Sequence, residues 1–458
     1  MRLIARYVKD VTEYFELVTV YDEKITRETI SKENPSFKTL MREHPSCIWF
    51  ERKIKDDFGI KIENAFDNRR LIHQERFPQN ISPMRKDFTQ KEIDFADYVP
   101  YKYEAIEGDG VFQVAVGPIH AGIIEPGHFH FSQAGEDMLH QEVRHFYKYR
   151  AIEKMLEGKT LFEAKKIVSR ISGNESIAYQ IALRDIIVEA SKMALPNSLR
   201  VEHAILLELE RLIHHFTDLG FIPNDAGFAS ALAYCSKLSE DTRRVMKKLT
   251  NHRFGFDSIG FEKLNFDAPY LKEFMDVLEG EIAFFEDWIM DIPSLWDRFD
   301  TTGILSKENA LKYDAVGVVA RASGVAVDRR ESDFYKSYGF ELCLENCGDV
   351  GARFKLRVAE VKNSIAMIKN FLEDYKRNSL LLKETKSRDG EYFTYVESSL
   401  GEIFMSIEIK NNTIERFFVR DPSFVNWQVL HLMMPNNIIA DFPLINKSCD
   451  LSYAGNDL

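Results

Sequence analysis

The sequence predicts an α+β protein, mainly α, in which a helical bundle core is joined by small β elements and a short N-terminal α/β module. Two patterns predict the elements: two long segments place apolar residues at four–three spacing, and a segment near the C-terminal end alternates apolar and polar residues. The length of 458 residues exceeds what one compact core holds and indicates two or three domains.

The N-terminal module is expected over residues 1–90, because a charged stretch rich in turn residues, ERFPQNISPMRKDF, closes it near Phe88. The second domain is expected over residues 91–458. It contains a strand pattern, VFQVAV, at residues 111–116, followed by a long loop rich in glycine, proline and histidine, GPIHAGIIEPGHFHF. From Gly135 onward helices are expected to dominate.

The two clearest helices are expected at residues 199–220 and 352–375. In each, one apolar stripe faces a helical core, as in a bundle, and neither stripe requires a cofactor. The stripes consist of Ile205, Leu209, Leu212, Phe216 and Leu219 in the first helix, and of Phe354, Val358, Val361, Ile365, Ile368 and Leu372 in the second.

The C-terminal region changes character. Residues 392–420 alternate apolar and polar side chains around the turn-like Lys410-Asn411-Asn412, which predicts a hairpin. The segment DPSFVNWQVL follows, and then an irregular apolar stretch, NNIIADFPLINKSCDLSYAGNDL. We expect this last stretch to pack into the core or an interface, because it is too apolar to remain in solvent.

Composition and charge exclude several classes of protein. The net charge of −12 argues against a nucleic-acid partner, since phosphate contacts need a dense Lys/Arg surface. The charged start, MRLIARYVKDVTEYFELV, is neither a signal peptide nor a membrane anchor, and no window reaches the roughly 18 consecutive apolar residues of a transmembrane helix. We therefore expect a protein in water that docks onto membrane proteins.

The five cysteines are sparse and irregularly spaced, which favours a reducing compartment without structural disulfides. Cys343 and Cys347 form the one close pair and would share a face if their segment is helical. Two ligands do not complete a metal site, so free thiols are the preferred interpretation.

Four segments carry residues of chemical interest. His120, Glu125, His128 and His130 lie within eleven residues and suit metal ligation or proton relay, but solvated or hydrogen-bonded histidines explain the loop as well. In the segment from Arg170 to Ser176, Ser172 or Asn174 would cap the following helix with Glu175 in its first turn.

The other two segments are His252-Arg253-Phe254 and DPSFVNW at residues 421–427, where an aspartate before proline is ordinary turn chemistry. There is no G-x-G-x-x-G after a strand, no G-x-x-x-x-G-K-[ST], no G-x-S-x-G and no H-E-x-x-H. Nucleotide-binding loops, a hydrolase elbow and zinc peptidase chemistry are therefore unsupported.

From about Val111 to Leu458 the chain contains, in order, GPIHAGIIEPGHF, RVEHAILLELERLIHHFTDLGFIPNDAGF, HRFGF, VARASG, GDVGARFKLRVAEV, DPSFVNW, DFPLINKS and LSYAGNDL. This series resembles the large subunit of membrane-bound, energy-converting nickel–iron hydrogenases of the hydrogenase-4 and formate hydrogenlyase type. That family is similar in turn to the quinone-site subunit of respiratory complex I. The N-terminal ERKIKDDFGIKIENAFDNRRLIHQERFP resembles, in shortened form, the C-terminal half of the small hydrophilic complex I subunit.

The chain departs from this family at the metal. The hydrogenases hold nickel and iron with two C-x-x-C pairs, in R-x-C-G-x-C and D-P-C-x-x-C, because soft thiolates suit low-valent nickel. The matching segments here are RISGNE and DPSFVN, which lack all four sulfurs. The four positions are occupied by Ser172, Glu175, Ser423 and Asn426. The resemblance thus implies no nickel–iron centre and no metal ligand in this chain.

The replacements follow the complex I form, where an Asn-Glu pair also stands at the vacated metal position, here Asn174 and Glu175. Complex I places a quinone-contacting tyrosine before that pair, whereas the aligned residue here is Val168. The loop keeps the hydrogenase form, and only His120 matches a histidine in both families. Quinone is therefore the one cofactor that the resemblance leaves open for this chain.

The resemblance implies a large-subunit homologue in a membrane-bound oxidoreductase complex that couples electron transfer to ion translocation. Its implied partners are an iron–sulfur small subunit, which holds the cluster, and membrane ion-translocating subunits, with this chain peripheral on the cytoplasmic side of the cytoplasmic membrane. Two alternatives remain: a NADH–quinone oxidoreductase-type subunit with a quinone pocket, and a non-catalytic scaffold. Electron donor and acceptor, pumped ion and hard-metal binding at Glu175 stay undefined.

The expected pocket has two kinds of residue. Glu175, His120 and Arg170 are the candidates for proton- or redox-linked chemistry, with Glu175 buried beside Arg170. The remnant metal pocket or quinone pocket is expected to be lined by Ser172, Asn174, Ser423 and Asn426.

Overall fold

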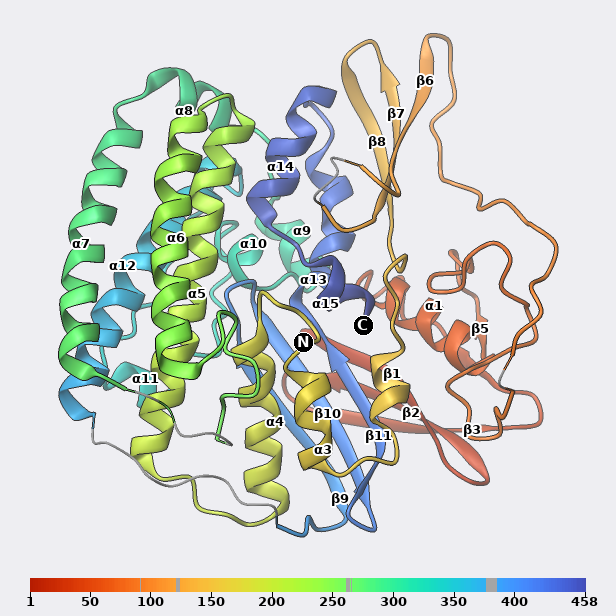
Figure 1. The fold of residues 1–458 in the computed structure, drawn as a ribbon. Coiled ribbons are helices and arrows are strands. Elements are labelled where there is room, and N and C mark those ends of the chain that lie inside the picture. Colours follow the sequence, from red (N-terminus) through yellow and green to blue (C-terminus); the bar gives the residue numbers. More distant parts are fainter. Residues whose placement is uncertain (91, 121–123, 261–263, 265, 376–384) are drawn as a thin grey trace.

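A computed structural model describes residues 1–90, 92–120, 124–260, 264, 266–375 and 385–458 of the protein. Its elements form a helical layer, a central antiparallel sheet and an N-terminal module (Figure 1). This confirms the mainly helical α+β class. The expected boundary between residues 90 and 91 remains a prediction, because residue 91 lies outside the described residues.

The N-terminal module combines an antiparallel sheet with one helix. Strands β1 (Leu3–Asp10), β2 (Tyr14–Tyr21) and β3 (Ile25–Ser31) pair in sequence order, and a parallel pair joins β4 (Ser36–Lys38) to β5 (Lys61–Glu63). Helix α1 (Cys47–Phe58) ends at Gly59 in the left-handed conformation, which glycine adopts without strain. It packs on β1.

The helical layer is built on the two helices that the sequence predicts. They are α5 (Asn197–Asp225) and α12 (Val350–Asp374), which pack on each other. Helix α6 (Ala229–Thr250) covers α5, and α7 (Ala268–Met290) covers α12 (Figure 1). The shorter helices nearby are α8 (Pro293–Phe299), α9 (Lys307–Lys312), α10 (Gly317–Arg321) and α11 (Asp333–Lys336).

The predicted hairpin is confirmed and gains a third strand. Strands β9 (Gly390–Glu397), β10 (Glu402–Lys410) and β11 (Thr413–Arg420) form an antiparallel sheet with the turn at Asn411 and Asn412. Helix α4 (Ser176–Ala190) packs on β9 and β10, and α2 (Ile152–Leu156) and α3 (Leu161–Val168) precede it.

A second antiparallel sheet corrects two expectations. Strand β6 (Val111–Val116) lies where VFQVAV predicts it, but β7 (His128–Ala134) begins inside the expected loop and β8 (Asp137–Arg144) occupies a region expected to be helical. Part of that loop, residues 121–123, lies outside the described residues. The segment of Cys343 and Cys347 is not helical, so the two thiols do not share a helix face.

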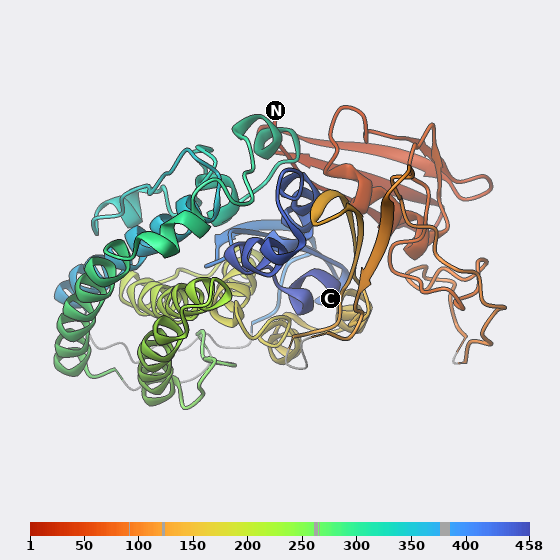
Figure 2. The same ribbon diagram turned by 90° about the horizontal axis from the view of Figure 1, so that it is seen from above.

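The C-terminal segments lie between the helical layer and the N-terminal module, as both views show (Figures 1 and 2). They are α13 (Pro422–Asn426), η1 (Trp427–Met433), η2 (Ile439–Asp441), α14 (Phe442–Cys449) and α15 (Tyr453–Asp457). Their apolar residues are buried, as the sequence predicts: Phe442, Leu444, Ile445, Leu451 and Tyr453.

Candidate functional site

The four positions that the sequence comparison singles out meet in the interior. Ser172 and Glu175 come from the turn between α3 and α4, while Ser423 and Asn426 come from α13. Each is at most 2% exposed. The site therefore joins two segments about 250 residues apart in the chain, at the centre of the molecule.

Ser452, just before α15, connects two of these positions. Its Oγ lies 3.3 Å from Ser172 Oγ, and its backbone N–H donates to Ser423 Oγ at 2.9 Å. Ser452 Oγ also accepts the backbone N–H of Gly455 at 2.9 Å and so caps α15. Ser172 and Ser423 are thus satisfied by hydrogen bonds within the protein.

Asn426 has a structural role. Its side-chain oxygen accepts the backbone N–H of Val316, and its amide group donates to the Val316 carbonyl, both at 3.1 Å. This pair of bonds fixes the chain immediately before α10 against α13.

Glu175 is the ionisable residue among the four positions. Ser398, after β9, donates its hydroxyl to Glu175 Oε1 at 2.5 Å. Asp421 lies beside the same carboxyl and accepts the Tyr179 hydroxyl at 2.6 Å and the Ser423 backbone N–H at 2.7 Å. Both carboxyls are almost completely buried.

Burial raises the pKa of Glu175 well above its ordinary value of 4.5, and the neighbouring Asp421 raises that pKa further. Burial and the same two carboxyls also raise the pKa of the Tyr179 hydroxyl. Two adjacent buried carboxylates cannot both ionise cheaply, so the Glu175 carboxyl holds its proton to higher pH than an exposed glutamate does.

A third carboxyl supports the helix that carries Glu175. Glu210 of α5 accepts the backbone N–H groups of Ile177 (2.7 Å) and Ala178 (3.2 Å) in the first turn of α4. Glu175, the residue before α4, makes no side-chain cap bond, and neither Ser172 nor Asn174 is the capping residue. This corrects the expected N-cap, because a side chain distant in the sequence supplies the acceptor.

Arg170 does not belong to this site. Its side chain is 44% exposed, pairs with Asp257 at 2.8 Å and lies over the ring of Phe256. The expectation that Glu175 is buried beside Arg170 is wrong, because Arg170 points outward from the same turn. Asn174 is half-buried and contributes its backbone N–H to Ser172 Oγ at 3.4 Å.

His120 lies in a neighbouring aromatic cluster that also contains His145 and Tyr453. His120 packs edge-on against Phe129, and the His145 ring lies 5.2 Å from the Tyr453 ring. His120 Nε2, both ring nitrogens of His145 and the Tyr453 hydroxyl are buried without a geometric hydrogen-bond partner among the described residues. Burial lowers the pKa of His145 to about 3, so this imidazole is neutral at pH 7.

Several functional candidates were not apparent from the sequence. Asp421 looks like a turn residue before proline, and Glu210 lies in an amphipathic helix where a polar residue is ordinary. The one signal in the sequence was the C-terminal LSYAGNDL, which contains Ser452 and Tyr453. Within the described ranges, no group of three or more His, Cys, Asp or Glu side chains is arranged to hold a metal ion.

The fold can be compared with solved structures. The structure of the membrane-bound sulfane sulfur reductase, an archaeal respiratory membrane complex, contains a chain that matches 76% of this one and 99% of its own length, with a TM-score of 0.71 and 20% identity. The two chains share a fold.

Comparison with models of known protein families identifies the family of this chain. The chain belongs to the family described as the respiratory-chain NADH dehydrogenase 49 kDa subunit, whose model matches residues 225–387 and 375–457. The model of the 30 kDa subunit of the same enzyme matches residues 5–93. The resemblance inferred from the motifs is confirmed.

Curated relatives extend over nearly the whole chain. Formate hydrogenlyase subunit 5 of Escherichia coli (strain K12) is 28% identical over 94% of this chain and 78% of its own length. Hydrogenase-4 component G of the same organism is 26% identical over the same shares. An NADH-quinone oxidoreductase subunit of Phocaeicola vulgatus is 23% identical over 93% of this chain and 88% of its own. The chain is thus homologous to subunits of both kinds of enzyme.

Proposed function

We propose that this chain is the large subunit of a membrane-bound oxidoreductase complex that couples electron transfer to ion translocation. In this proposal the position of the hydrogenase metal centre is occupied by a carboxyl pair, Glu175 and Asp421, which takes up and releases a proton. The observation that carries the proposal is the buried contact of these two acids at that position.

The donor set at the four positions does not fit a nickel–iron centre. Two hydroxyls, a carboxyl and an amide replace four thiolates, and the hydroxyls and amide are weak or hard ligands. Their hydrogen-bonding capacity is also engaged: Ser172 and Ser423 contact Ser452, and Asn426 holds the backbone of Val316. These contacts support a protein-filled, polar site in place of the metal.

The carboxyl pair is suited to redox-linked proton transfer. Burial and the neighbouring Asp421 raise the pKa of Glu175, and an added negative charge nearby would strengthen proton binding further. Reduction of a cluster in an adjacent subunit would supply such a charge, and reoxidation would weaken proton binding again. Ser398 holds the Glu175 carboxyl in place and is a positioning residue.

The partners belong to the same proposal. The motif resemblance implies an iron–sulfur small subunit and membrane ion-translocating subunits as partners, with this chain attached at the cytoplasmic face. The structural match to a chain of a respiratory membrane complex supports membrane partners. Among the helices in the described ranges, none combines the length and apolar character needed to cross a bilayer. Attachment through partner subunits is consistent with that finding.

The proposal is tested by Glu175→Gln in the purified native complex, with electron-linked ion transport as the readout. We expect loss of transport and of its pH dependence, because glutamine cannot exchange a proton. Asp257→Asn, which removes the half-buried partner of the exposed Arg170, is the control and should leave transport intact. Full transport in Glu175→Gln would support a scaffold role, and stoichiometric nickel with matching hydrogen turnover would overturn the proposal.

A quinone site is the second candidate. The ring nitrogens of His120 and His145 that lack a hydrogen-bond partner among the described residues favour it, with the Tyr453 ring beside His145. A hydroxyl donor and neutral imidazoles are the groups that hydrogen-bond the two carbonyls of a quinone, which would supply two-electron redox chemistry when bound. Tyr453→Phe should lower the quinone content of the purified complex several-fold, with Tyr234→Phe as the control. Equal quinone content in both variants would exclude Tyr453 from binding.

A further inference from the structure

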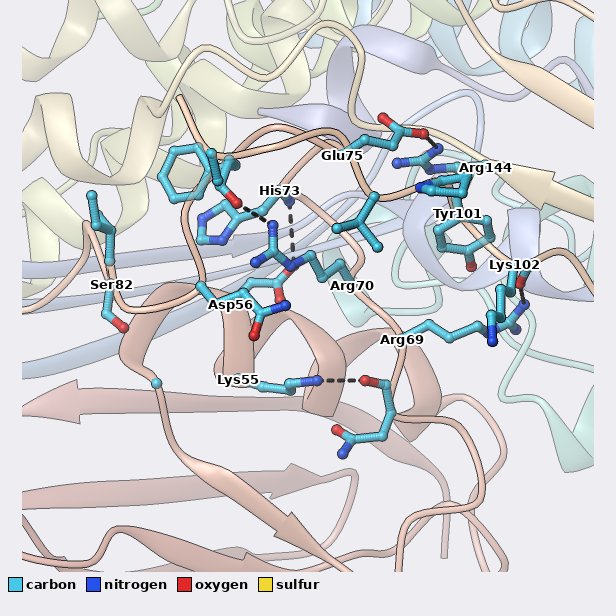
Figure 3. Close-up of a pocket in the computed structure, with 18 of the residues that line it drawn as sticks. Lys55, Asp56, Arg69, Arg70, His73, Glu75, Ser82, Tyr101, Lys102 and Arg144 are labelled. Atoms are coloured by element: carbon cyan, nitrogen blue, oxygen red, sulfur yellow. Dashed lines mark hydrogen bonds and ion pairs between the residues drawn. The ribbon is translucent and has the colours of Figure 1, made fainter. Parts of the chain in front are cut away.

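A cavity of about 570 Å³ lies in the N-terminal part of the chain (Figure 3). Its walls come from the end of α1, the start of β5, the irregular segment that follows β5, and residues 96–102. The volume is within the range of small-molecule sites, about 300–1,000 Å³. None of the residues discussed for the central site lines it.

The cavity has a charge opposite to that of the whole chain. Its lining contains six Lys or Arg residues and three Asp or Glu residues, whereas the chain as a whole has a net charge of −12. The basic residues are Lys55, Lys61, Arg69, Arg70, Lys102 and Arg144. The acidic residues are Asp56, Glu75 and Asp97.

Two of the three acids are already engaged by the protein. Asp56 Oδ2 accepts the backbone N–H groups of Leu71 and Ile72, each at 2.8 Å, and so holds the loop closed. Glu75 pairs with Arg144. The six cations still outnumber the three acids, although the Asp56 carboxylate offsets part of the charge of Lys55.

Lys55 and Arg70 are half-buried, and within the described residues neither forms an ion pair with a carboxylate. Lys55 donates to the carbonyl of Asn68, and Arg70 donates to the carbonyl of Phe77 (Figure 3). Burial lowers the pKa of the Lys55 ammonium. The Asp56 carboxylate opposes that shift, and the positive charges of Arg52 and Arg70 add to it. A bound anion would compensate both charges.

Another part of the lining consists of apolar side chains and two stacked rings. Ile60, Ile81 and Val99 line it, together with the rings of His73 and Phe77, which stack with centroids 3.8 Å apart. Burial lowers the pKa of His73 to about 4, so this ring is neutral at pH 7 and behaves as an aromatic surface. The cavity thus offers a cationic end and a surface for an apolar or planar body.

We propose that this cavity binds a small organic phosphate, with its phosphate at Lys55 and Arg70 and its apolar or planar body against His73 and Phe77. A phosphate matches two cations better than a monocarboxylate, because its oxygens accept from both the ammonium and the guanidinium. Because the stacked rings offer a surface for packing, we expect the ligand to carry an apolar or planar group in addition to its phosphate.

Isothermal titration calorimetry of the full chain at pH 7 tests the site with four probes: inorganic phosphate, adenosine 5′-monophosphate, adenosine and hexyl phosphate. We expect one or both organic phosphates to bind at least tenfold more tightly than inorganic phosphate or adenosine. Failure of both organic phosphates to bind would overturn the proposal. Equal affinity for inorganic phosphate would overturn the role of the rings.

Variants separate the site from general charge attraction. Lys55→Gln should weaken the binding organic phosphate about tenfold, the size expected for losing one charge-assisted hydrogen bond. Lys55→Arg keeps the charge and should retain most of the affinity. Lys237→Gln, which removes an exposed cation from α6, should bind as the unmodified chain does. Equal affinity in Lys55→Gln, with its fold verified by circular dichroism, would exclude this cavity as the site.

Discussion

Glu210 is a single buried carboxyl whose proton is linked to folding. Burial raises its pKa from 4.5 to about 8, although the two backbone N–H groups that it accepts oppose the shift. The folded chain therefore retains a proton at Glu210 that the unfolded chain releases above pH 4.5. The contribution of this group to stability is fully present at low pH and is lost as pH rises from about 4.5 to 8.

We expect Glu210→Gln to remove this pH dependence, because glutamine keeps an acceptor for the α4 N–H groups but does not titrate. Urea unfolding of the full chain at several pH values from 5 to 8 measures the effect. The slope of the unfolding free energy should change by about 1.4 kcal/mol per pH unit relative to the unmodified chain. Glu189→Gln, at an exposed position of α4, is the control. Identical slopes for Glu210→Gln and the unmodified chain would contradict the assigned shift.

For single residues, the sequence could identify which positions lie in the site but not where each side chain points. The motif comparison selects Ser172, Glu175, Ser423 and Asn426, and all four lie in the interior. It could not show that Arg170, in the same turn, points to solvent, because that depends on Asp257, which lies 87 residues further along. The partner Ser398, 223 residues from Glu175, is likewise supplied only by the tertiary fold.

The contact between α10 and the β9–β10 turn illustrates how elements are fitted together beside the site. Gly317, the first residue of α10, has a φ of +65°, and a Cβ there would lie 1.8 Å from the Leu400 carbonyl oxygen. Both the left-handed backbone and the close approach require glycine. The turn held in this way is the one that carries Ser398.

Gly317→Ala should therefore lower the free energy of unfolding by about 2–4 kcal/mol, from backbone strain and the steric clash combined. Urea unfolding measures it. Gly280→Ala is the matched control: it lies inside α7 with open space around its Cβ position, so the alanine should stabilise the chain by up to about 1 kcal/mol. A Gly317→Ala variant as stable as Gly280→Ala would show that the contact tolerates a side chain.

Element prediction succeeds where an apolar periodicity is long and fails where a strand is recognised only from its pairing. Helices α5 and α12 show their apolar stripes over many turns, so local sequence suffices. Strand β7 has a sequence, HFHFSQA, that follows a loop rich in glycine and proline, and its assignment depends on pairing with β6 and β8 on either side. Such pairing contributes no local signal.

On the scale of the whole molecule, buried charges join the N-terminal module to the rest of the chain. Lys53 of α1 pairs with Asp57 in the same helix and with Glu153 of α2, and Glu153 also pairs with Arg416 of β11. Burial raises the pKa of Asp57 to about 6, while Lys53 opposes the shift. The module and the central sheet thus share one buried ionic cluster.

Lys53→Met should lower the free energy of unfolding by about 3–5 kcal/mol, because it leaves Asp57 and Glu153 without their shared cation. The double variant Lys53→Met/Asp57→Leu should recover part of that loss, since it removes one of the uncompensated acids. Calorimetric unfolding of the full chain measures both, and a single transition is expected because the cluster spans the two parts. Separate transitions, or a neutral Lys53→Met, would argue that the module is held mainly by apolar contacts.

Intrinsic tryptophan fluorescence of the chain can be used to follow the site. Of the four tryptophans, Trp427 lies 4.1 Å from the His145 ring and donates its indole N–H to the Ser452 carbonyl, while Trp49 lies 6.1 Å from the same imidazole. The other two indoles, Trp288 and Trp296, stand apart in the helical layer. Because indole emission responds to charge and hydrogen bonding around it, the fluorescence of the native chain gives a label-free signal of events at the centre of the molecule, with Trp288 and Trp296 as an internal background.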